Sequence, residues 1–326
     1  MRTVGRFLTR ALMGLGVVLV IVAGVGWAAF QRDMRAARAR VDGSESEMAD
    51  TACGPIEYAT AGEGPPVLVV HGAGGGYDQG LLLGRLLVED GYQVIAPSRF
   101  GYLNSPIPAD DSLEAQADAF ACLLDELEIE KVAVIGFSAG GPPSLQFALS
   151  YPERTAALVL GAAISTPGAS DMGIDASDAT RNAFIASDLA YWLAITLARP
   201  KLVEVLGVSP AVQARLTPEE AAQVDEVLEL MLPLSARLEG IGLDQRITDG
   251  LDLPLENVSA PTLVFHALDD TLVPYANGQH SAETIPGARL VTLEDGGHFL
   301  VGHQEEMLAE TAALLEAQLN EAGDWQ

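Results

Sequence analysis

Short apolar runs alternate with longer helical segments from about residue 54 onward, and this alternation constrains the fold more than any other feature of the chain. Strands are predicted at residues 56–61, 67–70, 93–97, 132–136, 157–160, 262–267 and 289–293. Helices are predicted at residues 81–89, 112–127, 138–151, 276–285 and 304–319. Strands and helices in alternation form a mostly parallel sheet with helices on both faces. We therefore expect an α/β core built from residues 54–163 and 256–320.

Residues 164–255 interrupt this alternation. They contain helical stretches at residues 182–197 and 218–232 and no convincing strand. A helical insertion after a strand is typical of a cap over the mouth of the sheet. Apolar side chains at helical spacing are expected either to line a substrate pocket or only to pack the cap on the core. They are Met172, Phe184, Leu189, Tyr191, Trp192, Leu193 and Leu197.

The amino-terminal part of the chain predicts a membrane anchor. Residues 11–30 carry no charge, and as a helix they would be about 30 Å long, which matches the hydrocarbon core of a bilayer. We expect a single-pass helix here, after a basic tail at residues 1–10, with a removed secretory signal as the alternative. Residues 31–53, basic and then polar, are expected to link the anchor to the core. Arginines flank the span in nearly equal number, so the side of the membrane stays open.

The charge balance excludes one class of partner. The chain has 45 acidic and 18 basic residues, a formal net charge of −27. Such a surface repels phosphate, so no nucleic-acid partner is expected. We interpret the acidity as a solvated surface that keeps the protein soluble, with salty surroundings or a cationic ligand as the alternatives.

The two cysteines, Cys53 and Cys122, show neither metal-ligand spacing nor a CxxC pair. Cys122 falls on an apolar position of the predicted helix at residues 112–127. Two buried free thiols are therefore expected, with a disulfide between them as the alternative.

The motif GFSAG, residues 136–140, stands between a predicted strand and a predicted helix. A sharp strand-to-helix turn leaves no room for side chains at Gly136 and Gly140. The turn lifts the hydroxyl of Ser138 to the carboxyl edge of the sheet, where open α/β sheets bind ligands. It also places Ser138 at a helix amino terminus, whose amides favour negative charge. Ser138 is therefore the candidate nucleophile, and a capping serine in a glycine-rich turn is the alternative.

A second motif, HGAGGG at residues 71–76, directly follows a predicted strand. Its glycines let the backbone present amide donors. We expect the amides of Ala73 and Ala139 to bind an oxyanion, with Gly74 as the second choice for the first of them. A phosphate-binding loop is the competing interpretation, but the motif lacks the Gly-Lys-Ser/Thr ending of a P-loop.

A nucleophilic serine needs a base and an acid that orients the base. His298 follows the last predicted strand, in a loop that reaches the carboxyl edge beside Ser138. Two aspartates, Asp269 and Asp270, follow the strand at residues 262–267, and either is within reach of that histidine. The order serine, aspartate, histidine is the order found in α/β hydrolases. Asp269 is assigned to the turn.

From about residue 54 to 320 the sequence resembles the α/β-hydrolase fold family, and within it the capped esterase, haloperoxidase-like and carbon–carbon-bond hydrolase branch. The matching segments are HGAGGG, residues 97–105, GFSAG, the strand that ends in Asp-x-x-Val-Pro, and GGH at residues 296–298. The resemblance implies the set Ser138, Asp270 and His298, because the family's acid falls four residues before the proline. In residues 97–105, Ser98 replaces the usual acid and Leu103 the second glycine, which puts the hydrogen bonds of that loop in doubt.

These residues predict a serine hydrolase that cleaves an ester or related carbonyl compound through an acyl-enzyme at Ser138. The expected substrate is a small apolar ester or ketone. Carbon–carbon bond hydrolysis, perhydrolysis and acyl transfer on the same residues are the alternatives within the enzymes. A non-catalytic, membrane-tethered binding protein on a hydrolase scaffold is the alternative outside them. No cofactor and no metal are expected, because the sequence has no dinucleotide fingerprint and no metal-ligand spacing.

Overall fold

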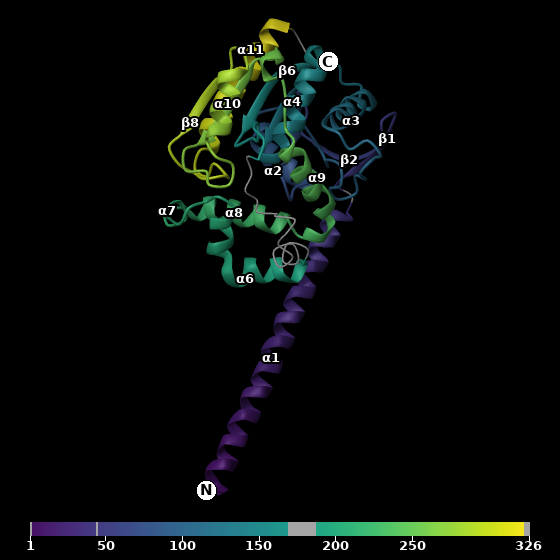
Figure 1. Cartoon of the computed structure of the whole chain (residues 1–326). Coiled ribbons are helices and arrows are strands. Elements are labelled where there is room, and N and C mark those ends of the chain that lie inside the picture. The colour runs from purple at the N-terminus through teal and green to yellow at the C-terminus, as the bar shows by residue number, and fades with distance from the viewer. Residues whose placement is uncertain (1, 44, 169–186, 323–326) are drawn as a thin grey trace. The chain divides into compact units, whose positions relative to one another are not determined.

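The computed structural model describes residues 2–43, 45–168 and 187–322. The chain divides into two units, Met1–Gly43 and Ser44–Gln326. The first unit is one continuous helix, α1 (Arg2–Val41), which is drawn in purple in Figure 1. Its Leu12–Val41 segment contains an 18-residue window with a mean hydropathy of 2.3 and is long and apolar enough to cross a membrane. The uncharged stretch at residues 11–30 therefore lies within a helix, as predicted.

The expected linker at residues 31–53 is wrong in part. Helix α1 continues through the arginine-rich stretch to Val41, and Glu47–Thr51 forms a strand, β1. This strand pairs antiparallel with β2 (Gly54–Ala61). Its sequence, EMADT, lacks the apolar alternation of a strand, because β1 lies at the edge of the sheet and three of its five side chains are exposed.

The second unit is built around a sheet that has eight strands in the described part of the chain, in the order β1-β2-β4-β3-β5-β6-β7-β8. The remaining strands are β3 (Pro66–Val70), β4 (Gln93–Pro97), β5 (Val132–Phe137), β6 (Thr155–Gly161), β7 (Thr262–Ala267) and β8 (Arg289–Leu293). Strands β3 to β8 pair in parallel, and β2 runs antiparallel to β4. The seven predicted strands correspond to β2 through β8. Figure 1 shows β1 and β2 at one edge of the sheet and β8 at the other.

Helices cover both faces of this sheet, and the strand side chains alternate between the two faces. The helices of the core are α2 (Tyr77–Glu89), α3 (Leu113–Glu126), α4 (Gly141–Ser150), α10 (Ala276–Thr284) and α11 (Gln304–Ala322). In β3, Val67 and Val69 pack with α2 and α11, and Leu68 and Val70 pack with α3 and α4. The carboxyl ends of β3, β5, β6 and β7 thus meet at one rim, where the motif residues are expected.

Between β6 and β7 the chain forms the helical cap. Its helices are α6 (Asp188–Val205), α7 (Pro210–Gln213), α8 (Pro218–Leu230) and α9 (Leu238–Asp249). Helices α6, α7 and α8 lie together at one end of the second unit in Figure 1. Tyr191 is buried within the cap and donates a hydrogen bond to the carbonyl of Leu228 at 3.1 Å, so it packs the cap. Leu197 is 78% exposed, and Met172 and Phe184 lie outside the described residues.

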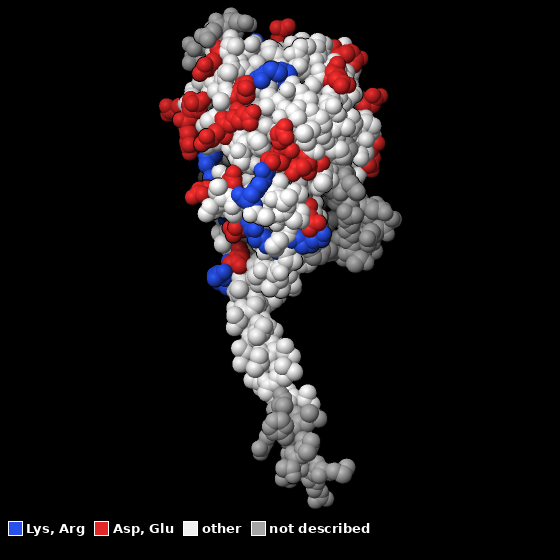
Figure 2. All heavy atoms as spheres, turned by 90° about the vertical axis from the view of Figure 1, so that its left-hand side faces the viewer, with Lys and Arg blue, Asp and Glu red and all other residues white. Residues whose placement is uncertain are grey.

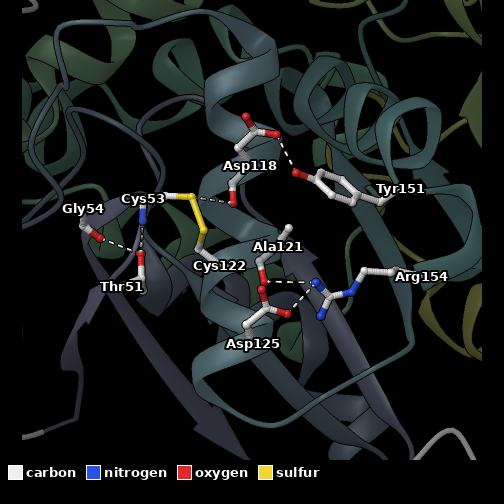
Figure 3. Close-up of a disulfide and its surroundings, with 9 residues drawn as sticks. All are labelled: Thr51, Cys53, Gly54, Asp118, Ala121, Cys122, Asp125, Tyr151 and Arg154. Carbon is white, nitrogen blue, oxygen red and sulfur yellow. Dashed lines mark hydrogen bonds and ion pairs between the residues drawn. A yellow bond between two sulfur atoms is a disulfide. The ribbon is translucent and has the colours of Figure 1, made fainter.

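The expectation of free thiols is wrong, because Cys53 and Cys122 form a disulfide (Figure 3). It joins the turn between β1 and β2 to the middle of α3, across 69 residues of sequence, and the two Cα atoms are 6.0 Å apart. Spacing along the chain could not reveal this pair, since only the packing of α3 beside the edge strands brings the two residues together. Cys53 is exposed to solvent, so the bond lies at the surface.

Replacing both cysteines by serine is expected to lower the free energy of unfolding by roughly 2–4 kcal/mol, because a long closed loop restricts the unfolded chain. Urea unfolding followed by tryptophan fluorescence measures this difference. Reductant should shift the wild-type midpoint to that of the double variant and leave the double variant unchanged. An unchanged wild-type midpoint in reductant would contradict the prediction.

Candidate active site

Ser138 lies on a strained turn between β5 and α4. Strand β5 ends at Phe137, a short 3₁₀ turn spans Ser138–Gly140, and α4 begins at Gly141. Ser138 has φ +54°, a left-handed conformation that costs a residue other than glycine about 1–3 kcal/mol. A Cβ at Gly136 would collide with the Ser144 side chain, and one at Gly140 with the Val70 carbonyl. The two glycines of the motif are therefore required by the packing of this turn.

The structure brings Ser138, His298 and Asp270 into one chain of hydrogen bonds. Nε2 of His298 lies 2.9 Å from Oγ of Ser138, and Nδ1 lies 2.9 Å from Oδ2 of Asp270. All three residues are buried, with exposed fractions of 6%, 2% and 6% in the order Ser138, His298, Asp270. Both contacts are satisfied when Nδ1 carries the proton and Nε2 accepts from the serine hydroxyl. Three segments far apart in sequence thus place a hydroxyl, an imidazole and a carboxylate in line.

Asp270 is held as a carboxylate. Burial alone would raise its pKa, but the adjacent His298 and hydrogen bonds from His266, His298 and Val273 outweigh burial and bring the pKa below its usual range. The amides of Leu272 and Val273 each donate to Oδ1 at 2.9 Å, which fixes the carboxylate and leaves Oδ2 for the histidine. His266 is fully buried, and its Nε2 lies 2.8 Å from the Val273 carbonyl.

The loop that carries His298 is tied down by two groups. Asp269 accepts a hydrogen bond from the Gly297 amide at 2.8 Å, so this aspartate acts on the histidine loop and is more than a turn residue. The His298 amide donates at 3.0 Å to the carbonyl of Gly207, which follows α6 in the cap. Gly207 has φ +86°, and a Cβ there would press on the Cβ of His298. The role of Gly207 could not be predicted from the sequence, because nothing in the local sequence relates it to the histidine.

The glycine-rich loop after β3 is held rigidly beside Ser138. Gln79 accepts from the Gly72 amide at 2.8 Å, and Arg237 donates to the Gly75 carbonyl. Burial, and next the charge of Arg99, place the pKa of His71 well below its usual value, so its ring is neutral. It lies 2.7 Å from the Gly72 carbonyl through Nδ1 and accepts from the Arg99 amide through Nε2. His71 therefore orders the loop through hydrogen bonds.

The two amides expected to bind an oxyanion belong to Ala139 and Ala73. Ala139 directly follows Ser138 and is 6% exposed. Ala73 is half-buried, and among the described residues no hydrogen bond takes up its amide. Close packing of Gly72 against the Cβ of Ser138 shows that the loop runs next to the serine. Ala73 is therefore the residue after one that packs against Ser138.

Two buried ion pairs join the cap to the core around this loop. Arg237, just before α9, pairs with Asp78 of α2 at 2.7 Å and is fully buried. Asp244 of α9 pairs with Arg99 at 2.5 Å and also accepts from the hydroxyl of Tyr102. The cap thus supplies the cation of one pair and the anion of the other. No sequence motif indicated either pair, because each joins residues about 150 positions apart.

Arg237→Met is expected to destabilise the fold by roughly 3–5 kcal/mol, because it removes the buried cation from Asp78. Adding Asp78→Asn should restore a large part of that loss, since no buried anion then remains at the site. Urea unfolding of the wild type, the two single variants and the double variant gives the coupling energy. Strictly additive losses would show that the two side chains do not act as a pair.

The loop at residues 97–105 keeps its order although Ser98 stands where the family has an acid. The missing carboxylate comes from Glu57 of β2, which is 1% exposed. Glu57 accepts from the Ser98 hydroxyl at 2.7 Å and from the side-chain amide of Asn104 at 2.7 Å. The hydroxyl of Ser105 in turn accepts from the Glu57 amide at 2.9 Å. The departure from the family pattern is therefore compensated by a residue on a neighbouring strand.

Acidic side chains gather on the face drawn in Figure 2, with basic side chains among them. Surface arginines form ion pairs with acids, among them Arg85 with Glu226, Arg215 with Asp295 and Arg289 with Glu310. Within the described residues, no group of three or more His, Cys, Asp or Glu side chains could hold a metal ion.

Comparison with known families agrees with this geometry. A family model described as alpha/beta hydrolase fold matches residues 65–302. The chain therefore belongs to the α/β-hydrolase fold family, and it is a hydrolase of that fold. This confirms the resemblance that the sequence motifs predicted.

Relatives span almost the whole second unit. The chain is 30% identical over 290 residues to the uncharacterized hydrolase YcgS of Bacillus subtilis (strain 168), a match that covers 80% of this chain and 94% of YcgS. It is 29% identical over 268 residues to the 2-hydroxy-6-oxo-6-phenylhexa-2,4-dienoate hydrolase of Comamonas testosteroni. This match covers 78% of this chain and 88% of that enzyme. An α/β hydrolase fold protein from Nakamurella multipartita superimposes with a TM-score of 0.69 at 30% identity, covering 83% of this chain and 99% of that one.

Proposed function

We propose that this chain is a serine esterase that cleaves small apolar esters through an acyl-enzyme on Ser138. The observation that carries the proposal is the line of two 2.9 Å contacts from Ser138 through His298 to Asp270. Oγ of Ser138 attacks the ester carbonyl carbon while Nε2 of His298 takes its proton. Asp270 stabilises the imidazolium that forms. His298 then gives this proton to the departing alcohol, and water releases the acyl group by the same steps.

The negative oxygen that develops during attack would be bound by the amides of Ala73 and Ala139. Supporting this assignment are the place of Ala139 at the start of the turn before α4 and the availability of the Ala73 amide among the described residues. Donors that are fixed before the reaction are worth roughly 3–4 kcal/mol each in comparable sites. The hydrogen bonds of Gln79 and Arg237 to the glycine-rich loop supply that rigidity.

An ester is favoured over the dienoate named for the Comamonas testosteroni relative. A dienoate carries a carboxylate, which needs a cation in a buried site. Among the described residues, the two buried guanidinium groups beside the glycine-rich loop, Arg99 and Arg237, are each paired with an aspartate of their own. A neutral ester needs no buried cation, because its carbonyl needs only the serine and the two amides.

A substrate panel tests the proposal. The full chain in phosphatidylcholine nanodiscs would be assayed with p-nitrophenyl acetate, butyrate and octanoate and with 2-hydroxy-6-oxo-6-phenylhexa-2,4-dienoate. We expect turnover of at least one ester at rates well above its spontaneous hydrolysis, and a smaller kcat/KM for the dienoate. Turnover of the dienoate without turnover of any ester would overturn the assignment.

We further propose that α1 anchors the chain in a membrane and that the second unit lies on the oxidising side. The apolar Leu12–Val41 segment supports the anchor, and the Cys53–Cys122 disulfide supports the side, because such bonds persist in oxidising compartments. Protease added to spheroplasts of a bacterial host that makes the chain should digest the second unit. Protection of that unit until the membrane is lysed would contradict the orientation.

A further inference from the structure

An apolar cavity of about 210 Å³ lies between α2, α8 and α11, above strands β5 and β6. Apolar side chains from the three helices, the two strands and the loop after β8 make up most of its wall. Representative lining residues are Leu83 and Leu86 of α2, Val224 and Val227 of α8, and Met307 and Leu308 of α11. A single water molecule needs a cavity volume of roughly 10–15 Å³, so this cavity has room for a chain of several methylene groups.

The floor of this cavity is unusual for a central parallel strand. In β5, Val132, Ala133 and Val134 are fully buried, whereas Ile135 and Phe137 on the α2 and α11 face are only half-buried. Strands of a parallel sheet are normally covered by helices on both faces. Here the helices leave two apolar side chains of the central strand only partly covered by protein. An uncovered apolar surface in a concave site is typical of a place that a ligand fills.

Two residues of the cavity wall are direct chain neighbours of the candidate catalytic residues. Phe137, which lines the cavity, directly precedes Ser138, and Phe299, which also lines it, directly follows His298. The ring of His298 lies 5.3 Å from the ring of Phe137 and 6.1 Å from the ring of Phe299, measured between centroids. A group bound in the cavity therefore lies within one side-chain layer of the reacting atoms.

We propose that this cavity binds the straight hydrocarbon chain of the acyl group that Ser138 carries. This inference rests on the proposed esterase function and adds a substrate class to it. The charged lining residue Arg85 is exposed and paired with Glu226, so the lining offers no buried charge for a polar chain. Each buried methylene favours binding roughly fourfold, so a longer acyl chain should improve kcat/KM until the cavity is full.

Filling the cavity tests this assignment. Val227→Trp places an indole in it from the cap, and Ala222→Trp places the same group on an exposed position of the same helix as a matched control. In the wild type, kcat/KM should rise at least tenfold from p-nitrophenyl acetate to the octanoate. Val227→Trp should lower the octanoate value at least tenfold and keep the acetate value within twofold, while Ala222→Trp should keep both within twofold.

A substitution in a second wall of the cavity provides an independent test if Val227→Trp fails to fold. Leu308→Trp fills the cavity from α11 and should reproduce the selective loss for octanoate. Methyl octanoate and dioctanoyl phosphatidylcholine, assayed side by side, separate a free ester from a lipid as the source of the chain. An octanoate preference that survives in folded Val227→Trp and Leu308→Trp would overturn the proposal, as would an equal loss for acetate and octanoate in both.

A binding measurement tests whether the cavity holds a hydrocarbon chain, independently of the esterase function. In Ser138→Ala protein, a dodecanol that bears an aliphatic diazirine should label peptides of α2 and α11 on illumination. Val227→Trp in that background should abolish this labelling, and Ala222→Trp should not. Cavity labelling together with a wild type that cleaves no ester would contradict the esterase function alone. Labelling confined to other parts of the chain would contradict the cavity.

Discussion

Ser138→Ala is expected to lower kcat for p-nitrophenyl butyrate by roughly 10⁴- to 10⁶-fold, the range seen when a triad serine is removed. Without the hydroxyl there is no atom in line with Nε2 of His298 to form the acyl-enzyme. The binding surfaces and the amides stay in place, so KM should change only a few-fold. Initial rates at saturating substrate measure the effect.

Ser150→Ala is the matched control for this substitution. Ser150 ends the same helix, α4, and its exposed hydroxyl accepts a hydrogen bond from Gln146. We expect that variant to keep kcat within twofold. Residual turnover of Ser138→Ala above about one percent of wild type, in protein that unfolds at the wild-type temperature, would exclude Ser138 as the nucleophile, since removal of a triad serine costs far more than this.

Asp270→Asn is expected to lower kcat roughly 10⁴-fold, because an amide at this position favours the wrong imidazole tautomer. The asparagine NH₂ would donate to Nδ1 of His298, the proton would move to Nε2, and Nε2 could no longer accept from Ser138. The matched control is Asp269→Asn, which keeps an oxygen to accept from the Gly297 amide. That control should stay within tenfold of wild type, and equal losses in the two variants would contradict the assignment of the acid.

The same carboxylate contributes to acid stability. Because the folded state lowers the pKa of Asp270, its ionised form stabilises the fold above the unfolded carboxyl pKa of about 3.9, and this contribution is lost as the pH falls below that value. Asp270→Asn has no such group. Between pH 7 and pH 3, the free energy of unfolding of wild type should therefore fall further than that of the variant.

The parts of this molecule that could be predicted from sequence are those with a local signal. A buried parallel strand shows as a short apolar run, and the tight turn at Ser138 shows as two glycines at fixed spacing. The neighbourhood of His298 and Asp270 followed from topology, because parallel strands end at one rim. The residues that meet at this rim could therefore be predicted from the sequence.

The features that sequence could not supply are contacts between distant segments. The Cys53–Cys122 disulfide depends on how α3 packs beside β1 and β2, and the Arg237–Asp78 pair depends on how the cap closes on α2. Gly207 contacts His298 through its backbone carbonyl, and the pattern of side chains in the sequence does not predict such a contact. The role of Glu57 depends on its hydrogen bonds with Ser98 and Asn104, which the sequence does not show.

The central claim is that His298 activates the hydroxyl of Ser138 as a nucleophile. Incubation of the full chain with a fluorophosphonate, followed by intact-mass and peptide mass spectrometry, tests it most directly. We predict one equivalent of label, located on Ser138, and a rate of labelling that falls at least a hundredfold in His298→Gln. Folded wild-type protein that takes up no label, or that takes it up at another residue, would contradict the account.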